Sequence, residues 1–143
     1  RGTFAANFTV RLSGMIATGF VLAALAALLH VYIFYMESIA WTSKRVRATF
    51  GTTEAEAAAT KELAFNQGVY NLLLASLVAA GIGLYLAGHE EGGAALTLAG
   101  VGPMAGAALV LLLSSPDKRR AALIQGTLPV LSLVPLTIGL IGG

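Results

Sequence analysis

Residues 12–36 read LSGMIATGFVLAALAALLHVYIFYM, a run of 25 residues without Asp, Glu, Lys or Arg. About 20 consecutive apolar residues cross a bilayer as an α-helix, so this run predicts a transmembrane helix. Its apolar core is too long for a secretory signal peptide, and no Ala-x-Ala cleavage pattern follows. Leu and Ala are strong helix formers, and the two-residue alternation of a membrane β-strand is missing.

Three comparable runs follow at residues 63–89, 92–116 and 121–143. Only 11% of the 143 residues are charged and 57% are hydrophobic, whereas a soluble domain carries about 25% charged residues. This composition excludes soluble and disordered proteins, and the lack of cysteine excludes disulfides and thiolate metal sites. We therefore expect an all-α bundle of four transmembrane helices, a single integral membrane domain. Its spans are about 12–36, 63–88, 92–116 and 121–142, with a cytoplasmic loop at about 37–62.

The Lys and Arg residues predict the orientation of this bundle. The side that carries the first and third loops holds Lys44, Arg45, Arg47, Lys61, Lys118, Arg119 and Arg120. The opposite side holds only Arg1 and Arg11. By the positive-inside rule, the first and third loops face the cytoplasm and both termini lie on the extracytoplasmic side.

The first loop carries a helix-start signal. Thr53 and Glu56 have the spacing of a capping box, in which each side chain bonds the other residue's backbone N–H. The alanine-rich stretch 55–64 follows without a helix breaker before Gly68. We expect one helix that continues from this loop into the second span.

The beginning of the same loop combines aromatic and basic side chains. Trp41 and Phe50 flank Lys44, Arg45 and Arg47. Such residues form the interfacial belt of most membrane spans, where cations meet anionic lipid. A specific lipid-headgroup site at the three basic residues is the alternative interpretation.

Small residues recur at four-residue spacing in two of the runs. Gly102 and Gly106 form one such pair, and Gly19, Ala23 and Ala27 form a series. This spacing lets helix backbones approach closely, and we expect packing inside the bundle rather than a dimer interface. Prolines in the third and fourth runs are expected to kink these helices without ending them.

Polar side chains within or beside the spans are the candidate site. They are expensive in lipid and face the bundle interior. The set consists of His30, Glu37, Trp41, Asn66, Gln67, Tyr70, Asn71 and Gln125. Glu37, the amides and Gln125 lie near span ends on the cytoplasmic side, so we expect one cluster there, with His30 deeper.

Two interpretations of this cluster stay open. Its amides and carboxylate could satisfy one another and fix the register of the helices. Alternatively, they could line a binding pocket or proton path in which Glu37 and His30 titrate.

The sequence contains no catalytic signature. It lacks the nucleophile elbow, the His-Glu-x-x-His motif, the phosphate loop and the dinucleotide fingerprint. His89, Glu90 and Glu91 have no spacing that would direct them to one metal ion. These absences favour a non-enzymatic protein over an enzyme, and we expect no metal, no cofactor and no nucleic-acid partner.

Three segments carry a family resemblance: His30-Val31-Tyr32-Ile33 with Glu37 and Trp41; Phe50-Gly51; and the string 66–71, Asn-Gln-Gly-Val-Tyr-Asn. Together they resemble DUF1304, a family of small bacterial four-helix membrane proteins of unknown function. The resemblance covers about residues 20–130 and implies four spans and a location in the bacterial plasma membrane. It implies no activity.

Three functions remain as expectations. The first is an accessory subunit or assembly factor of a larger membrane complex, with lipid and other membrane subunits or a second copy as partners. The second is a small-molecule or proton-coupled transporter that uses the polar cluster. The third is a lipid-acting enzyme in which Glu37 is the acid or base and the loop cations hold phosphate.

Overall fold

The computed structural model describes the backbone of residues 2–142 and the side chains of residues 8–142. The described residues form helices and turns and no strand. In chain order the elements are α1 (Gly2–Phe34), the π-helical turn η1 (Tyr35–Ile39), α2 (Lys44–Phe50), α3 (Glu54–Ala59), α4 (Lys61–Leu86), α5 (Glu90–Ser114), the 3-10 turn η2 (Pro116–Lys118) and α6 (Arg119–Gly142). Four segments are long and apolar enough to cross a membrane: Phe8–Ile39, Lys61–Leu86, Glu90–Ser114 and Pro116–Gly142. The predicted all-α protein with four membrane-spanning helices is confirmed.

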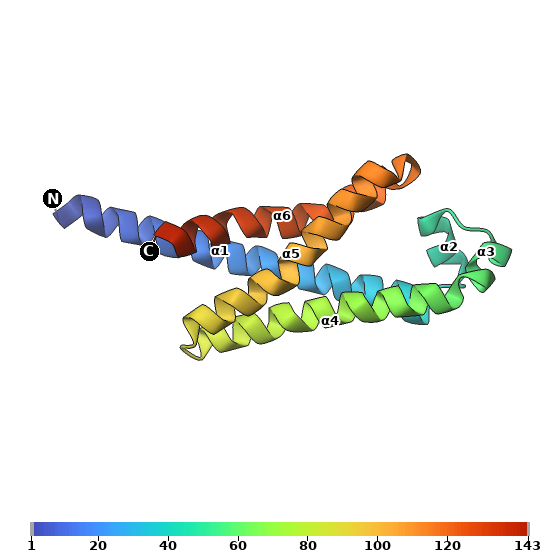
Figure 1. Cartoon of the computed structure of the whole chain (residues 1–143), viewed down its shortest axis with the longest axis horizontal. Helices are drawn as coiled ribbons and strands as arrows, with labels where there is room; N and C mark the ends of the chain where they lie inside the picture. The colour runs from blue at the N-terminus through green and yellow to red at the C-terminus, as the bar shows by residue number, and fades with distance from the viewer. Residues whose placement is uncertain (1, 143) are drawn as a thin grey trace.

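The four long helices pack in the ring order α1, α4, α5, α6. Figure 1 shows α6 along the N-terminal half of α1, α4 along its C-terminal half, and α5 crossing between them. The beginning of α1, the end of α6 and the α4–α5 turn lie at one end of the molecule. The two loops rich in Lys and Arg, which hold α2, α3 and η2, lie at the other end.

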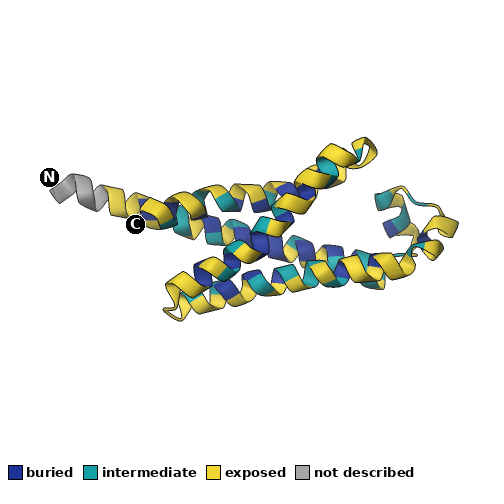
Figure 2. Ribbon diagram, in the orientation of Figure 1, coloured by how far each residue is buried: buried dark blue, intermediate teal, exposed yellow. Residues whose placement is uncertain are grey.

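Buried residues gather where α1, α4 and α5 cross (Figure 2). The buried cluster there consists of Ala23, Ala26, Ala27, Ala75, Val78, Val101 and Met104. Gly19 also faces inward, because a Cβ at this position would meet Leu136 of α6. The predicted internal packing of Gly19, Ala23 and Ala27 is therefore confirmed.

The expectation for the second small-residue pair is wrong. A Cβ added at Gly102 or Gly106 would meet nothing within 4 Å, so neither glycine packs inside the bundle. They lie on the outer side of α5, which also exposes Ala95 and Ala99. The helix has its buried residues elsewhere, including Val101 and Met104, and the four-residue spacing does not distinguish the two sides.

The prolines leave their helices continuous, as predicted. Pro103 lies inside α5, and Pro129 and Pro135 lie inside α6. α6 is also joined to α1 by a buried hydrogen bond, since Ser132 Oγ donates to the Gly19 carbonyl oxygen at 2.9 Å.

The expected continuous helix from the loop into the second span is not present. α3 ends at Ala59 and α4 begins at Lys61, with Thr60 between them at φ −103° and ψ 8°. The Thr60 hydroxyl donates to the Glu56 carbonyl oxygen at 2.7 Å, a back-bond that bends helices. The same oxygen accepts a bond from Trp41 Nε1 at 3.2 Å, which fixes this break against the end of the first span.

The predicted capping box of α3 is confirmed, and it makes the cap sensitive to pH. The Glu56 carboxylate accepts bonds from the Thr53 backbone N–H and hydroxyl, both at 2.8 Å, which lowers the pKa of Glu56. A lowered folded-state pKa means that the capping contribution is present above the ordinary Glu pKa. The contribution is lost as pH falls through the folded-state value. We expect NMR titration of Glu56 to give a pKa below the usual Glu range. Thr53→Ala removes the hydroxyl donor but keeps the backbone N–H donor, so it should raise the pKa of Glu56 only part of the way back to that range, and an unchanged pKa in this variant would contradict the hydroxyl's part in the cap.

Candidate functional site

The Glu37 carboxylate lies on an irregular turn at the end of α1. In η1 the Ala40 backbone N–H bonds the Tyr35 carbonyl oxygen at 3.0 Å, five residues back instead of four. Such π-helical turns are rare in proteins, and many of those that occur lie at functional sites. The wider turn changes the direction of the side chains after Phe34 relative to a regular α-helix.

The second wall of the site is the first half of α4, which approaches α1 closely at Gly68. A Cβ at Gly68 would meet the Ser38 hydroxyl and come within 3.1 Å of Glu37 Cβ. Two hydrogen bonds join the helices here. Asn71 Nδ2 donates to Glu37 Oε2 at 2.8 Å, and Ser38 Oγ donates to the Phe65 carbonyl oxygen at 3.0 Å.

Trp41 closes the site at the loop end. Its indole N–H bonds Thr60, and its ring lies 5.1 Å from the ring of Phe50, tilted by 59°. Around it, a small apolar cluster of Ile33, Met36 and Val46 seats α2 against the end of the first span.

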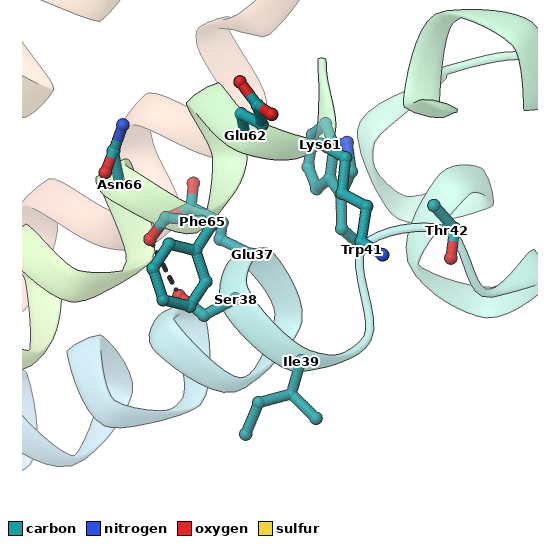
Figure 3. Close-up of a pocket in the computed structure, with 9 residues that line it drawn as sticks. All are labelled: Glu37, Ser38, Ile39, Trp41, Thr42, Lys61, Glu62, Phe65 and Asn66. Atoms are coloured by element: carbon teal, nitrogen blue, oxygen red, sulfur yellow. Dashed lines mark hydrogen bonds between the residues drawn. The ribbon is translucent and has the colours of Figure 1, made fainter. Parts of the chain in front are cut away.

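These elements border an open cavity of about 540 Å³ (Figure 3). One wall comes from the end of the first span and its following turn, the other from the start of α4. The lining residues are Glu37, Ser38, Ile39, Trp41, Thr42, Lys61, Glu62, Phe65 and Asn66. The lining therefore combines two carboxylates, one ammonium group, hydroxyl and amide groups, and two aromatic rings.

The structure brings together part of the predicted cluster. Glu37, Trp41 and Asn66 line the cavity, and Asn71 bonds Glu37 from behind. Gln67 and Tyr70 are exposed on α4 and do not line it. Because α4 turns by 100° per residue, consecutive polar residues of the string 66–71 cannot all face α1.

Two other predicted members lie outside the cavity. His30 is deeper in the first span and only 2% exposed, and its Nδ1 donates to the Ala26 carbonyl oxygen at 2.8 Å. With Nδ1 protonated, Nε2 of the neutral ring is an acceptor. Gln125 lies on α6, which packs against α1 and α5. The start of α6 diverges from the start of α4 in Figure 1, and Gln125 does not join the group around Glu37.

The basic residues of the first loop divide into two kinds. Lys44 and Arg45 are exposed. Arg47 is half-buried and forms an ion pair with Glu54, Nη2 to Oε2 at 3.3 Å, which joins α2 to α3. Arg47 thus has a structural partner, and the headgroup site at these three residues stays a prediction.

Sequence reasoning missed several lining residues. Lys61 and Glu62 were placed in the first loop, because a charge at a span boundary is the usual topology signal, and Phe65 was not singled out. The available signal was spacing: Glu62 and Asn66 are four residues apart and share one face of α4. Ser38 and Thr42 carry no such signal.

The residues that line the cavity all lie in the part of the sequence that a protein-family model matches. The family model of DUF1304, described as a protein of unknown function, matches residues 24–137. The chain belongs to the DUF1304 family. This DUF1304 match includes Asn71 and every residue that lines the cavity. No curated protein and no solved structure matches the chain.

Proposed function

We propose that this DUF1304 protein is a small-molecule transporter of the bacterial plasma membrane and that the Glu37 cavity is its substrate site. The observation that carries the proposal is that the Glu37 carboxylate uses only part of its hydrogen-bonding capacity within the protein. A carboxylate can accept about four hydrogen bonds. Among the described residues, Asn71 is its hydrogen-bond partner, and the carboxylate borders a cavity instead of packed side chains.

An ionisable side chain within a membrane span is expensive and typically marks a substrate or ion path. If Glu37 served only to hold α1 against α4, further donors would be expected around it. Gly68 and the bond from Ser38 to Phe65 already join the two helices without the carboxylate. A single carboxylate that holds either a proton or a substrate couples the two by competition.

Glu37→Gln should abolish this coupling. Gln retains a carbonyl oxygen that can accept the Asn71 bond, so the variant is expected to fold, but it can neither bind a proton nor carry charge. The protein is reconstituted in liposomes loaded with a pH-sensitive dye, and gradients of small amines, zwitterions and sugars are applied one class at a time. At least one class should drive proton movement. We expect Glu37→Gln to reduce this flux at least tenfold.

Glu91→Gln is the matched control, because Glu91 is an exposed carboxylate in the first turn of α5, away from the cavity. It should leave the flux unchanged. Equal flux in Glu37→Gln and wild type, or no flux with any class, contradicts the transporter. Loss of folded protein in Glu37→Gln alone would favour the structural role of the carboxylate.

An accessory subunit or assembly factor of a larger membrane complex is the second candidate. It is supported by the outer face of α5, where Ala95, Ala99, Gly102 and Gly106 leave a helix surface without bulky side chains. Small residues at this spacing allow another transmembrane helix to approach closely.

This candidate predicts co-purification with a defined larger complex after extraction in a mild detergent. Gly106→Leu should release the protein from that complex, because the leucine side chain would enter the contact with the partner helix. The fold should stay intact, because a Cβ at this position meets nothing within 4 Å. Recovery of the wild type only as a free monomer or homodimer would argue against a subunit role.

A further inference from the structure

A second hollow lies between α1 and α4, farther from the loops than the Glu37 cavity. It measures about 440 Å³ and is lined by Ala24, Ala27, Leu28, Val31, Ala75, Ser76, Val78, Ala79 and Ile82. Ser76 is its one hydroxyl-bearing residue, and that hydroxyl donates to the Leu72 carbonyl oxygen at 2.8 Å. The hollow is therefore an apolar surface with its polar group satisfied inside the helix.

The two hollows lie along one flank of the α1–α4 pair. On α1, steps of three and four residues lead from Ala24 through Leu28 to Val31, and η1 continues the first span from there to the cavity residue Ser38. Such steps keep to one face of a helix. On α4, the same steps connect Phe65, Leu72, Ser76 and Ala79. Residues of both faces line each hollow, Ser38 with Phe65 in the first and Leu28 with Ser76 in the second, so the two faces border the same side of the contact.

The distance between the hollows follows from the helical rise of 1.5 Å per residue. On the first span the nearest lining residues are Val31 of α1 and Glu37 of η1, about 9 Å apart along the axis. Asn66 and Ala75 are the nearest on α4, about 14 Å apart. Between them lie Tyr35 on the first span, which is exposed, and Leu72 on α4, which is half-buried. A single extended molecule can therefore reach from one hollow to the other.

The two hollows differ in chemistry. The Glu37 cavity has two carboxylates, Glu37 and Glu62, for one ammonium group, Lys61. Trp41 and Phe65 add aromatic rings, which attract organic cations. The second hollow accepts hydrocarbon. Charge and polarity thus match an amphiphile whose head is a cation and whose tail is an alkyl chain.

We propose that the ligand of this protein is an amphiphilic amine, with its ammonium group in the Glu37 cavity and its alkyl chain in the apolar hollow between α1 and α4. This inference rests on the proposed substrate site at Glu37 and adds the class of molecule. Single-chain organic amines and aminophospholipids share this chemistry.

Trp41 is the single tryptophan of the chain and lines the cavity, so its fluorescence reports occupancy. The protein in nanodiscs of phosphatidylcholine is titrated with decylammonium, ethylammonium and decyl sulfate, and affinities are corrected for partition into lipid. We expect decylammonium to bind at least tenfold more tightly than either other probe. Glu37→Gln should weaken its binding at least tenfold.

Ala79→Phe tests the tail, because this side chain fills the apolar hollow from α4. It should weaken decylammonium binding at least fivefold and leave ethylammonium binding unchanged. Ala24→Leu fills the same hollow from α1, and it replaces Ala79→Phe in this test if that variant does not fold. Ala80→Phe is the matched control, since Ala80 is exposed beside the hollow and does not line it.

The outcomes separate the two proposals. Tight binding of decyl sulfate, or binding of decylammonium that depends on Glu37 but not on Ala79 and Ala24, overturns the amphiphilic amine and leaves the Glu37 site in place. Binding of every probe that is unaffected by Glu37→Gln overturns both. Competition by phosphatidylethanolamine in the nanodiscs would identify an aminophospholipid as the occupant; lack of competition would identify a single-chain amine.

Discussion

Replacing Gly81 by alanine is expected to destabilise the protein by about 3 kcal/mol, the upper end of the cost of overpacking. The added Cβ would meet the Thr97 hydroxyl and lie 2.6 Å from the Thr97 backbone nitrogen and 2.7 Å from the Gly93 carbonyl oxygen. Backbone atoms cannot rotate away, so α4 and α5 would have to separate. The measurement is the free energy of unfolding in mixed micelles, from a denaturing-detergent titration followed by circular dichroism.

Gly83→Ala is the matched control on the same helix. A Cβ at Gly83 meets nothing within 4 Å, and alanine is the better helix former by about 1 kcal/mol. This variant should therefore be as stable as the wild type or slightly more stable. Equal stabilities of the Gly81 and Gly83 variants would show that α4 and α5 are farther apart than described here.

Gly68→Ala is expected to damage both the stability and the site. The added Cβ would displace the Ser38 hydroxyl, which costs the bond to Phe65 and forces α4 away from η1. We estimate a loss of about 2 kcal/mol, from overpacking and one hydrogen bond. The bond from Asn71 to Glu37 would lengthen, so substrate-driven proton flux should also fall, although less than in Glu37→Gln, because the carboxylate is still present.

A double variant identifies the cause of this loss. Ser38→Ala removes the oxygen that the new Cβ would meet, and the remaining contacts, to Glu37 Cβ and the Ser38 nitrogen, are both 3.1 Å. In the Gly68→Ala background it should restore part of the stability, although Ser38→Ala alone removes a hydrogen bond. Additive losses in the double variant would contradict the steric explanation.

The sequence was sufficient for the four spans because the bilayer imposes one strong requirement, a long apolar helix, on each of them. It was also sufficient to bring Glu37 near Asn71, since both residues lie near the same ends of adjacent spans. The capping box of Thr53 and Glu56 was predictable for a similar reason: all of its partners lie within one helical turn.

The features that could not be predicted depend on which side of a helix faces which neighbour. The four helices are apolar on all sides, so periodicity gives no direction for Gly102 and Gly106. The π-helical turn at Tyr35–Ile39 rotates the residues that follow it, and no sequence signal marks it. Gln125 was placed by depth alone, and α6 turned out to pack away from α4.

The pairing of the first helix with the last has a consequence for how the protein is made. The N-terminal half of α1 packs against α6, through Gly19, Ser132 and Leu136. Because chains are synthesised from the N-terminus, α1, α4 and α5 emerge from the ribosome while this half of α1 still lacks its partner. The contacts of α1 with α6 span more than 100 residues of chain. We expect final closure of the ring to be a post-synthetic step, and a chain that stops before α6 to expose the Gly19 carbonyl to lipid.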